Sequence, residues 1–242
     1  MARAHRFLLA LAALAALVAL ADVPADARQE QSPILQRFLA RLDPPAATYR
    51  ALRRLEARNE RFHASAWMDA WTEFDAVHGF RYDIVSEGGS SYIRSRVFRA
   101  ALDGERKLWM SHEPDRAELT AANYAFEDRG LDADGAATLA VTPRRKDMLL
   151  VDGSIFVNPV DADLLRVEGR LSKTPSFWTR RVEIVRRYAR VAGVRLPISI
   201  ESVAHVLIAG RATFRMAYEY ESVNGEHVGD PQPRVSAEGP HP

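Results

Sequence analysis

Apolar and polar residues alternate along the last third of the chain. In the stretch 194–210 the even-numbered positions are mostly apolar, while the odd-numbered ones include Glu201 and His205. The stretch 212–221 repeats the pattern, with aromatic residues and Met216 on one side and charged residues on the other. This alternation is typical of strands with one buried and one solvated sheet face. It predicts two long strands and raises the question of what covers their apolar face.

Similar short segments upstream predict further strands, separated at the distances usual for hairpins. Together with the two final strands they make about nine, which favours an antiparallel meander over a parallel sheet with crossover helices. Asp152–Gly153 is a strong two-residue hairpin signal, so a turn is expected there. The expected upstream strand regions are 61–75, 79–89, 122–130, 136–143, 147–159, 163–172 and 177–193.

Three short helices are expected on this sheet. The first begins with Ser32 as N-cap and Pro33 at the first helical position, and its apolar stripe runs to Leu42. The second follows Pro44 and Pro45 and carries Tyr49, Leu52 and Leu55 at helical spacing. The third lies around 95–109. Helices packed on one face of a curved antiparallel sheet define an α+β fold.

The first residues have the three parts of a secretory signal peptide. Arg3 and Arg6 form a basic start, 7–21 is an apolar run, and the Ala-Asp-Ala triplet at 25–27 is a small-residue cleavage site. The alternative, a membrane anchor, needs about 20 apolar residues. We therefore expect a cleaved signal peptide at 1–27, a periplasmic domain at 28–223 that spans no membrane, and a disordered tail rich in Pro, Gly and charge at 224–242.

Composition excludes several functions and leaves the chain a normal globular balance. Of its 242 residues 47% are hydrophobic and 27% charged, and the net charge is +1, so nothing indicates a nucleic-acid partner. The Arg-Arg pairs at 144–145, 180–181 and 186–187 lack the interleaved aromatic residues that stack on bases. There is no cysteine, which excludes thiolate zinc sites, a cysteine nucleophile and a lipid-modified N-terminal cysteine.

The usual catalytic motifs are missing from the sequence. It contains no nucleophile elbow, phosphate-binding loop, dinucleotide fingerprint or zincin helix. His63 and His205 could form a cross-strand metal site, but solvated surface histidines are the better interpretation. Glu201 could approach Glu219 or Glu221 as paired carboxylates, although ordinary cross-strand ion pairs with arginine are equally compatible. We expect no enzyme, no cofactor and no metal.

The apolar sheet face has two interpretations. The short helices could cover it completely, or they could leave an apolar cavity of the kind common at barrel mouths. The side chains that would line such a cavity are also the ones that would form an ordinary core. The candidate ligand-binding residues are Phe62, Met68, Phe80, Tyr82, Ile84, Ile198, Ile200, Phe214, Met216 and Tyr218.

The order of helices and strands resembles the outer-membrane lipoprotein carrier superfamily (LolA/LolB-like). The resemblance covers most of residues 33–223 and is carried by two stretches: Thr142 to Gly169, with "DGSIFV" and "DLLRVEG", and 167–202. It implies an unclosed half-barrel with a helical lid over an apolar cavity that receives acyl chains. The chain departs from the pattern in lacking a lipobox cysteine and room for a second domain. No single arginine matches the family's lid-latching arginine.

From these observations we expect a monomeric periplasmic carrier that holds a lipid or a lipoprotein acyl chain. One alternative is an envelope protein-interaction or sensor module of the RseB type, in which the cavity is filled. A hydrolase built on strand carboxylates or histidines is a weaker alternative. Envelope proteins are the expected macromolecular partners in either non-enzymatic case.

Overall fold

The computed structural model describes residues 32–41, 43–75, 77–110, 114–174 and 179–234. The expected signal peptide at 1–27 lies outside them. The first element is helix α1 (Pro33–Ala40), which begins as the sequence predicts. The Ser32 side chain accepts a hydrogen bond from the Leu35 amide at 3.3 Å, and Pro33 occupies the first turn, where no amide donor is required.

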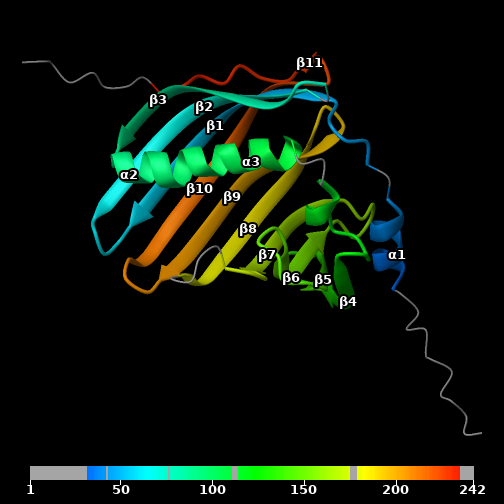
Figure 1. Ribbon diagram of the computed structural model, residues 1–242. Helices are drawn as coiled ribbons and strands as arrows, with labels where there is room; N and C mark the ends of the chain where they lie inside the picture. The colour runs from blue at the N-terminus through cyan, green and yellow to red at the C-terminus, as the bar shows by residue number, and fades with distance from the viewer. Residues whose placement is uncertain (1–31, 42, 76, 111–113, 175–178, 235–242) are drawn as a thin grey trace, which may run out of the picture. The chain divides into compact units, whose positions relative to one another are not determined.

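The described residues form an open antiparallel sheet of eleven strands, shown in Figure 1. Its order is β3-β2-β1-β10-β9-β8-β7-β6-β5-β4, so β3 and β4 are its two edges, and β11 pairs with β10. Strands adjacent in sequence pair with each other, except β3 and β4, and the two runs of strands are joined by the pairing of β1 with β10. The expected curved, unclosed antiparallel sheet is confirmed. The strands are β1 (Thr48–Asn59), β2 (Ala64–Asp75), β3 (Gly79–Gly89), β4 (Tyr124–Leu131), β5 (Ala137–Pro143), β6 (Val151–Val157), β7 (Leu164–Leu171), β8 (Thr179–Val191), β9 (Val194–Val206), β10 (Gly210–Val223) and β11 (Glu226–His227).

The second predicted helix is wrong: its residues form β1, at the centre of the sheet. Leu52 and Leu55 are both fully buried although Leu52 faces away from the helices and Leu55 faces toward them. A strand buried on both faces loses the alternation that identifies strands, and Tyr49, Leu52 and Leu55 then mimic helical spacing. Pairing with β2 and β10 overrides the helix propensity of this Ala-, Leu- and Arg-rich segment.

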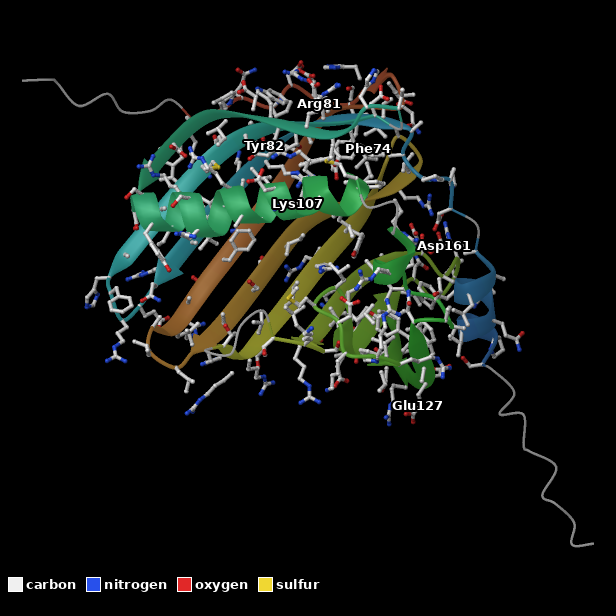
Figure 2. All side chains as sticks on the ribbon, viewed as in Figure 1. Phe74, Arg81, Tyr82, Lys107, Glu127 and Asp161 are labelled. Atoms are coloured by element: carbon white, nitrogen blue, oxygen red, sulfur yellow. The ribbon has the colours of Figure 1, made fainter. Side chains whose placement is uncertain are left out.

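One continuous helical segment lies across the sheet, as Figure 1 shows. It consists of α2 (Ser91–Ile93), the π-helical turn η1 (Arg94–Arg99) and α3 (Ala100–Met110), and a 3-10 turn η2 (Pro114–Ala117) follows. The prediction of a helix at 95–109 is confirmed, and the observed segment is longer at both ends, running from Ser91 to Met110. Side chains of β2 and β3 reach this helix, as Phe74 and Tyr82 in Figure 2 illustrate. The Tyr82 hydroxyl donates to Asp103 at 2.8 Å.

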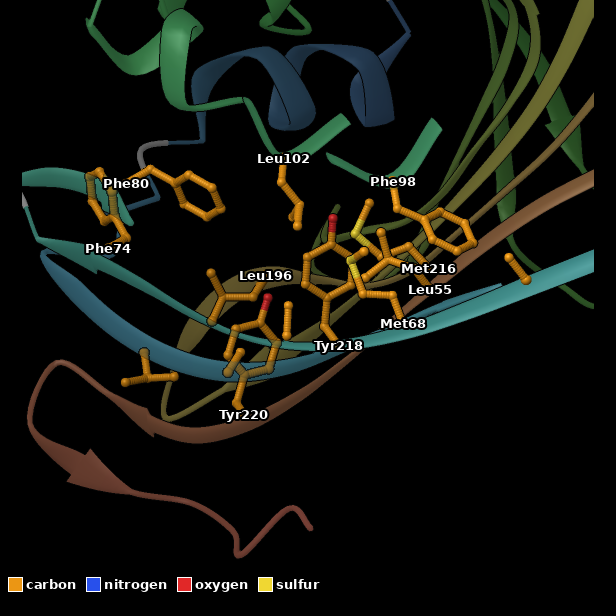
Figure 3. Packing of buried hydrophobic residues seen from close by; sticks show 14 of the residues in the cluster. Leu55, Met68, Phe74, Phe80, Phe98, Leu102, Leu196, Met216, Tyr218 and Tyr220 are labelled. Atoms are coloured by element: carbon orange, nitrogen blue, oxygen red, sulfur yellow. The ribbon is translucent and has the colours of Figure 1, made fainter. Parts of the chain in front are cut away.

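Two apolar clusters lie on the face of the sheet that carries the helix, here called the inner face. The larger one packs Phe98 and Leu102 of the helical segment onto β1, β2, β3 and β10, where Leu55, Met68 and Met216 meet (Figure 3). The second packs α1 onto β4–β8, with Phe38 lying 6.1 Å from the Phe126 ring between centroids. Each end of the sheet therefore has its own helical cover.

The hairpin predicted at Asp152–Gly153 is also wrong. Both residues lie inside β6, and Gly153 pairs with Gly169 of β7. A β-carbon on Gly153 would come 2.2 Å from the Glu168 carbonyl oxygen, and Gly169 has a φ of +155°. Two glycines thus let the backbones of β6 and β7 approach where side chains would keep them apart.

The segment 224–234, expected to belong to a disordered tail, is described and contacts the outer face of the sheet. β11 pairs with the end of β10, and the Arg234 amide donates to the Asp69 carboxylate at 2.6 Å. The Arg234 guanidinium lies over the ring of Trp67 at 5.2 Å. Polar contacts with β2 thus hold a segment whose composition alone is typical of disorder.

We predict that Gly153→Ala lowers the free energy of unfolding by about 1–3 kcal/mol, because the new methyl group meets backbone atoms that cannot move aside. Gly104→Ala is the matched control. Gly104 is exposed within α3 and a β-carbon there meets nothing, so the same change should stabilise by roughly 0.5–1 kcal/mol. Urea unfolding of both variants measures the difference, and equal effects would contradict the close approach of β6 and β7.

Candidate functional site

A cavity of about 950 Å³ lies on the inner face, between the two helical covers. This volume falls within the range of about 300–1,000 Å³ typical of small-molecule sites. A smaller hollow of about 560 Å³ involves charged outer-face side chains such as Arg215 and Arg234. The larger cavity is the more enclosed of the two and is lined by both helical covers, so it is the candidate site.

The walls of this cavity come from helices on one side and strands on the other. The helical side is apolar: Phe38 and Leu39 of α1, and Leu108 and Trp109 of α3. The strand side carries Leu164 of β7, Tyr188 of β8, Pro197 and Ile200 of β9, and Tyr218 of β10. Charged lining residues gather among them and are Arg41, Asp43, Glu105, Glu118, Arg186 and Arg195. The cavity is therefore amphipathic, with an apolar body and charged groups within reach of it.

Of the ten residues proposed from the sequence as ligand-binding, the structure brings two, Ile200 and Tyr218, to this cavity. Three others are buried in the core beneath the helical segment, and three pack against that core while partly exposed. Phe62 lies in the turn between β1 and β2 and is 60% exposed. The three buried residues are Met68, Phe80 and Met216, and the three packed against them are Tyr82, Ile84 and Phe214. Ile198 of β9 is partly buried, next to an irregularity in the pairing of β8 with β9.

A buried arginine joins the helical segment to the sheet next to the cavity. Arg53 of β1 is 1% exposed, and its guanidinium donates to the two carboxylate oxygens of Glu105 in α3 at 2.5 and 2.8 Å. It also donates to the Tyr49 hydroxyl at 3.0 Å and lies over the rings of Phe80 and Tyr218. Burial raises the pKa of Tyr218 to about 12, although the charge of Arg53 opposes this. Sequence reasoning missed Arg53 because it placed the residue in a helix.

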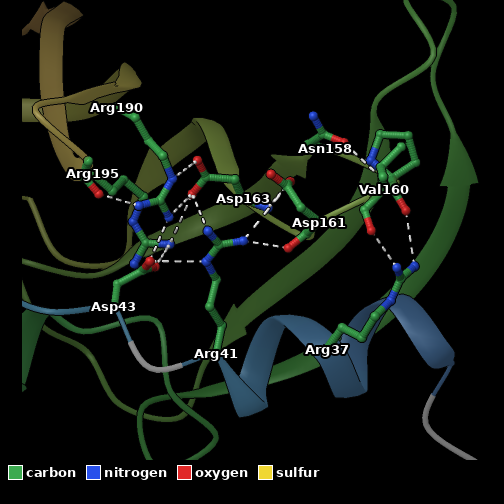
Figure 4. Close-up of polar contacts among 11 residues, drawn as sticks. Arg37, Arg41, Asp43, Asn158, Val160, Asp161, Asp163, Arg190 and Arg195 are labelled. Carbon is green, nitrogen blue, oxygen red and sulfur yellow. Dashed lines mark hydrogen bonds and ion pairs between the residues drawn. The ribbon is translucent and has the colours of Figure 1, made fainter.

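A second group of charges, here called the Asp43 cluster and shown in Figure 4, contributes Arg41, Asp43 and Arg195 to the cavity lining. It consists of Asp43, Asp163, Arg41, Arg190 and Arg195. Arg190 contacts Asp43 at 2.6 Å and Asp163 at 2.7 Å, and Arg195 contacts Asp43 at 2.9 Å. Burial would raise the pKa of Asp43, but hydrogen bonds from Arg190 and Arg41 and the charge of Arg195 hold it below its usual value. The cluster connects the end of α1 to β8 and β9.

The Arg-Arg pair at 186–187 is divided between the two sides of the sheet. Arg187 faces outward and pairs with Glu201 at 3.2 Å, whereas Arg186 lines the cavity. Neighbouring residues of a strand point to opposite faces, so these arginines do not form one basic patch.

The carboxylates considered from the sequence as an acid–base pair take part in ion pairs with arginine. Glu219 pairs with Arg54 at 2.5 Å, and Glu221 pairs with Arg50. His63 and His205 are both exposed, as expected for surface histidines. Within the described ranges, no three or more His, Cys, Asp or Glu side chains gather as a metal site would require.

None of the helices in the described segments combines the length and hydrophobicity needed to cross a membrane.

Comparison with known proteins gives structural similarity alone. No family model matches the chain, and no curated protein is similar to it. A LolA superfamily protein from Nitrosomonas europaea is similar in structure, with a TM-score of 0.42 and 12% identity, covering 78% of this chain and 91% of that one. An outer membrane lipoprotein-sorting protein domain from Vibrio parahaemolyticus has a TM-score of 0.39 and 12% identity, covering 80% and 93%.

A DUF1329 family protein from Desulfovibrio piger is also similar, with a TM-score of 0.38, 9% identity and coverage of 72% and 84%. At these values the likeness concerns the fold, and no residue or activity is transferred from those proteins to this chain.

We predict that Glu105→Gln lowers the free energy of unfolding by about 3 kcal/mol, because it leaves the Arg53 charge buried without a counter-ion. Amide exchange over 91–110 should rise, since α3 loses its polar contact with β1. Arg106→Gln is the control: Arg106 is half-exposed on the same helix, and its loss should cost at most about 0.5 kcal/mol. Equal losses would show that the Arg53–Glu105 pair does not hold the helix.

The Asp43 cluster predicts a defined pH dependence. The pKa of Asp43 is lower in the folded state than its value of about 3.9 in the unfolded chain. The carboxylate therefore contributes fully to the free energy of unfolding above that pH, and the contribution is lost as pH falls through the folded-state pKa. Asp43→Asn should therefore be less stable than the wild type at pH 7, and the difference should shrink below pH 4. Asp161→Asn is the control, because Asp161 is more than half exposed at the edge of the cluster. Urea unfolding at a series of pH values measures this, and a difference independent of pH would contradict it.

Proposed function

We propose that this protein is a periplasmic, non-enzymatic carrier that holds an acyl chain of a lipid or lipoprotein in the cavity between α1, α3 and β7–β10. The observation that supports the proposal is the cavity itself: about 950 Å³, with apolar walls from two separate helical covers. Each methylene group moved from water into such a site contributes about 0.8 kcal/mol. The signal peptide expected at 1–27 supports the location.

Loading requires that one wall of the cavity can move. The helical segment 91–110 is the best candidate, because residues 101–110 alternate between contact with the sheet and exposure, and Met110 is 70% exposed. Phe98 and Leu102 anchor the segment in the core, so the part able to move is its C-terminal end, where contact with the sheet depends on the buried Arg53–Glu105 pair and on the packing of Trp109 against Phe74. Local opening of such an end costs less free energy than unfolding of the sheet beneath it.

The alternative is an envelope interaction or sensor module, and one observation favours it. Much of the apolar inner face is filled by core side chains, including Met68 and Met216, so only part of that face is open to a ligand. The two functions differ in whether the cavity takes up an apolar molecule.

We predict that the protein, purified from its host envelope and stripped of lipid, binds the uncharged fluorophore N-phenyl-1-naphthylamine and releases it to dodecanol. Ile200→Glu should weaken this binding at least tenfold, since a carboxylate would enter the apolar wall. Ser199→Glu is the matched control, one residue away on the outer face. Native mass spectrometry before stripping should show a bound acyl species.

Two results would contradict the carrier function. One is that the folded wild type binds neither N-phenyl-1-naphthylamine nor dodecanol. The other is equal loss of binding in both variants, which would indicate a general effect on folding. The first result would favour the interaction module, whose test is the capture of envelope proteins by the ligand-free protein.

A further inference from the structure

Most charged groups that line the cavity are matched by partners among the described residues, and the exceptions are Arg186 and Glu118. Arg41, Arg195 and Asp43 belong to the Asp43 cluster, and Glu105 is bound by Arg53. Arg186 forms no hydrogen bond or ion pair with any described residue, and its Nε atom is buried without a partner. Glu118 lies on the same wall but is exposed, and no ion pair joins it to Arg186.

The position of Arg186 is set by the sheet. It pairs across the ladder with Ile200, so both side chains point to the inner face and into the cavity. Its positive charge acts on Tyr124 and Tyr218: burial raises the pKa of each, and the charge of Arg186 opposes the rise. The guanidinium therefore lies close to these aromatic side chains, partly buried in the cavity wall.

A partly buried cation without a counter-ion is costly, because desolvation is not offset by an interaction. A guanidinium carries its charge throughout the physiological pH range and presents a planar set of donors that suits carboxylate and phosphate groups. An unsatisfied buried polar group that lines a cavity is a candidate contact for a ligand that would complete it.

We propose that the ligand of this cavity is a single-chain amphiphile with an anionic head, and that Arg186 binds that head, a carboxylate or a phosphate, while the acyl chain lies against Ile200, Leu164 and the α1 and α3 side chains. This rests on the proposed carrier function and adds to it a requirement for negative charge. Arg186 thus selects among acyl ligands by the head group.

Titration calorimetry of the lipid-stripped protein with dodecanoate, dodecyl phosphate and dodecanol tests the proposal, with all three kept below their micellar concentrations. The wild type should bind at least one of the two anions at least about tenfold more tightly than dodecanol. Arg186→Met should abolish that preference and retain dodecanol binding. Arg187→Met, the neighbour on the outer face, should keep the preference.

The outcomes separate this proposal from the carrier function. Equal binding of the anions and dodecanol by the wild type, or a preference that survives in Arg186→Met, overturns the role of Arg186 and leaves the carrier function standing. No binding of any dodecyl compound overturns both. Inorganic phosphate or acetate competing at the same concentration as the dodecyl anions would show a site for a free anion and overturn the amphiphile.

Thermal unfolding distinguishes a binding role from a structural one. Because the Arg186 Nε is buried without a partner, Arg186→Met should unfold at the same temperature as the wild type or a higher one. A marked fall in unfolding temperature would show that Arg186 stabilises the fold, and would contradict its assignment to the ligand.

Discussion

The architecture depends on one requirement: the inner face of the sheet is apolar and has to be kept from water. Two separate elements meet this requirement. The helical segment 91–110 covers β1–β3 and β10, and α1 covers β4–β8. The cavity lies where these covers adjoin and is lined by residues of both. The candidate site is therefore the part of a single apolar face that neither cover fills.

Both covers are fastened by charges as well as by apolar packing. Arg53 joins α3 to the central strand, and the Asp43 cluster joins the end of α1 to β8 and β9. Apolar packing has little directional preference, whereas an arginine–carboxylate pair fixes both distance and orientation. Fixed in this way, α1 and α3 leave a space of defined size between them. Arg186 differs from these arginines because no carboxylate of the described residues pairs with it.

Much of the fold follows from sequence pattern, and the errors have physical causes. The alternation in β9 and β10 predicts their positions because one face of each is solvated. The same reasoning fails for β1, where Leu52 and Leu55 are buried on opposite faces, and for Gly153, whose turn-like sequence allows close strand contact. The cavity itself could not be predicted, because Ile200 lines it while Met216, with the same pattern, is packed. Only the positions of the two covers distinguish them.

The pairing of β1 with β10 has a consequence for how the chain folds. These strands lie near opposite ends of the sequence and yet form the centre of the sheet. Such distant contacts must wait for loop closure over nearly the whole chain, which slows folding. During synthesis β1 and β2 emerge first, but one edge of β1 stays unpaired until residues 210–223 have been made. The native sheet can therefore be completed only after synthesis is nearly complete, so the growing chain cannot close the centre of its sheet while it is being made.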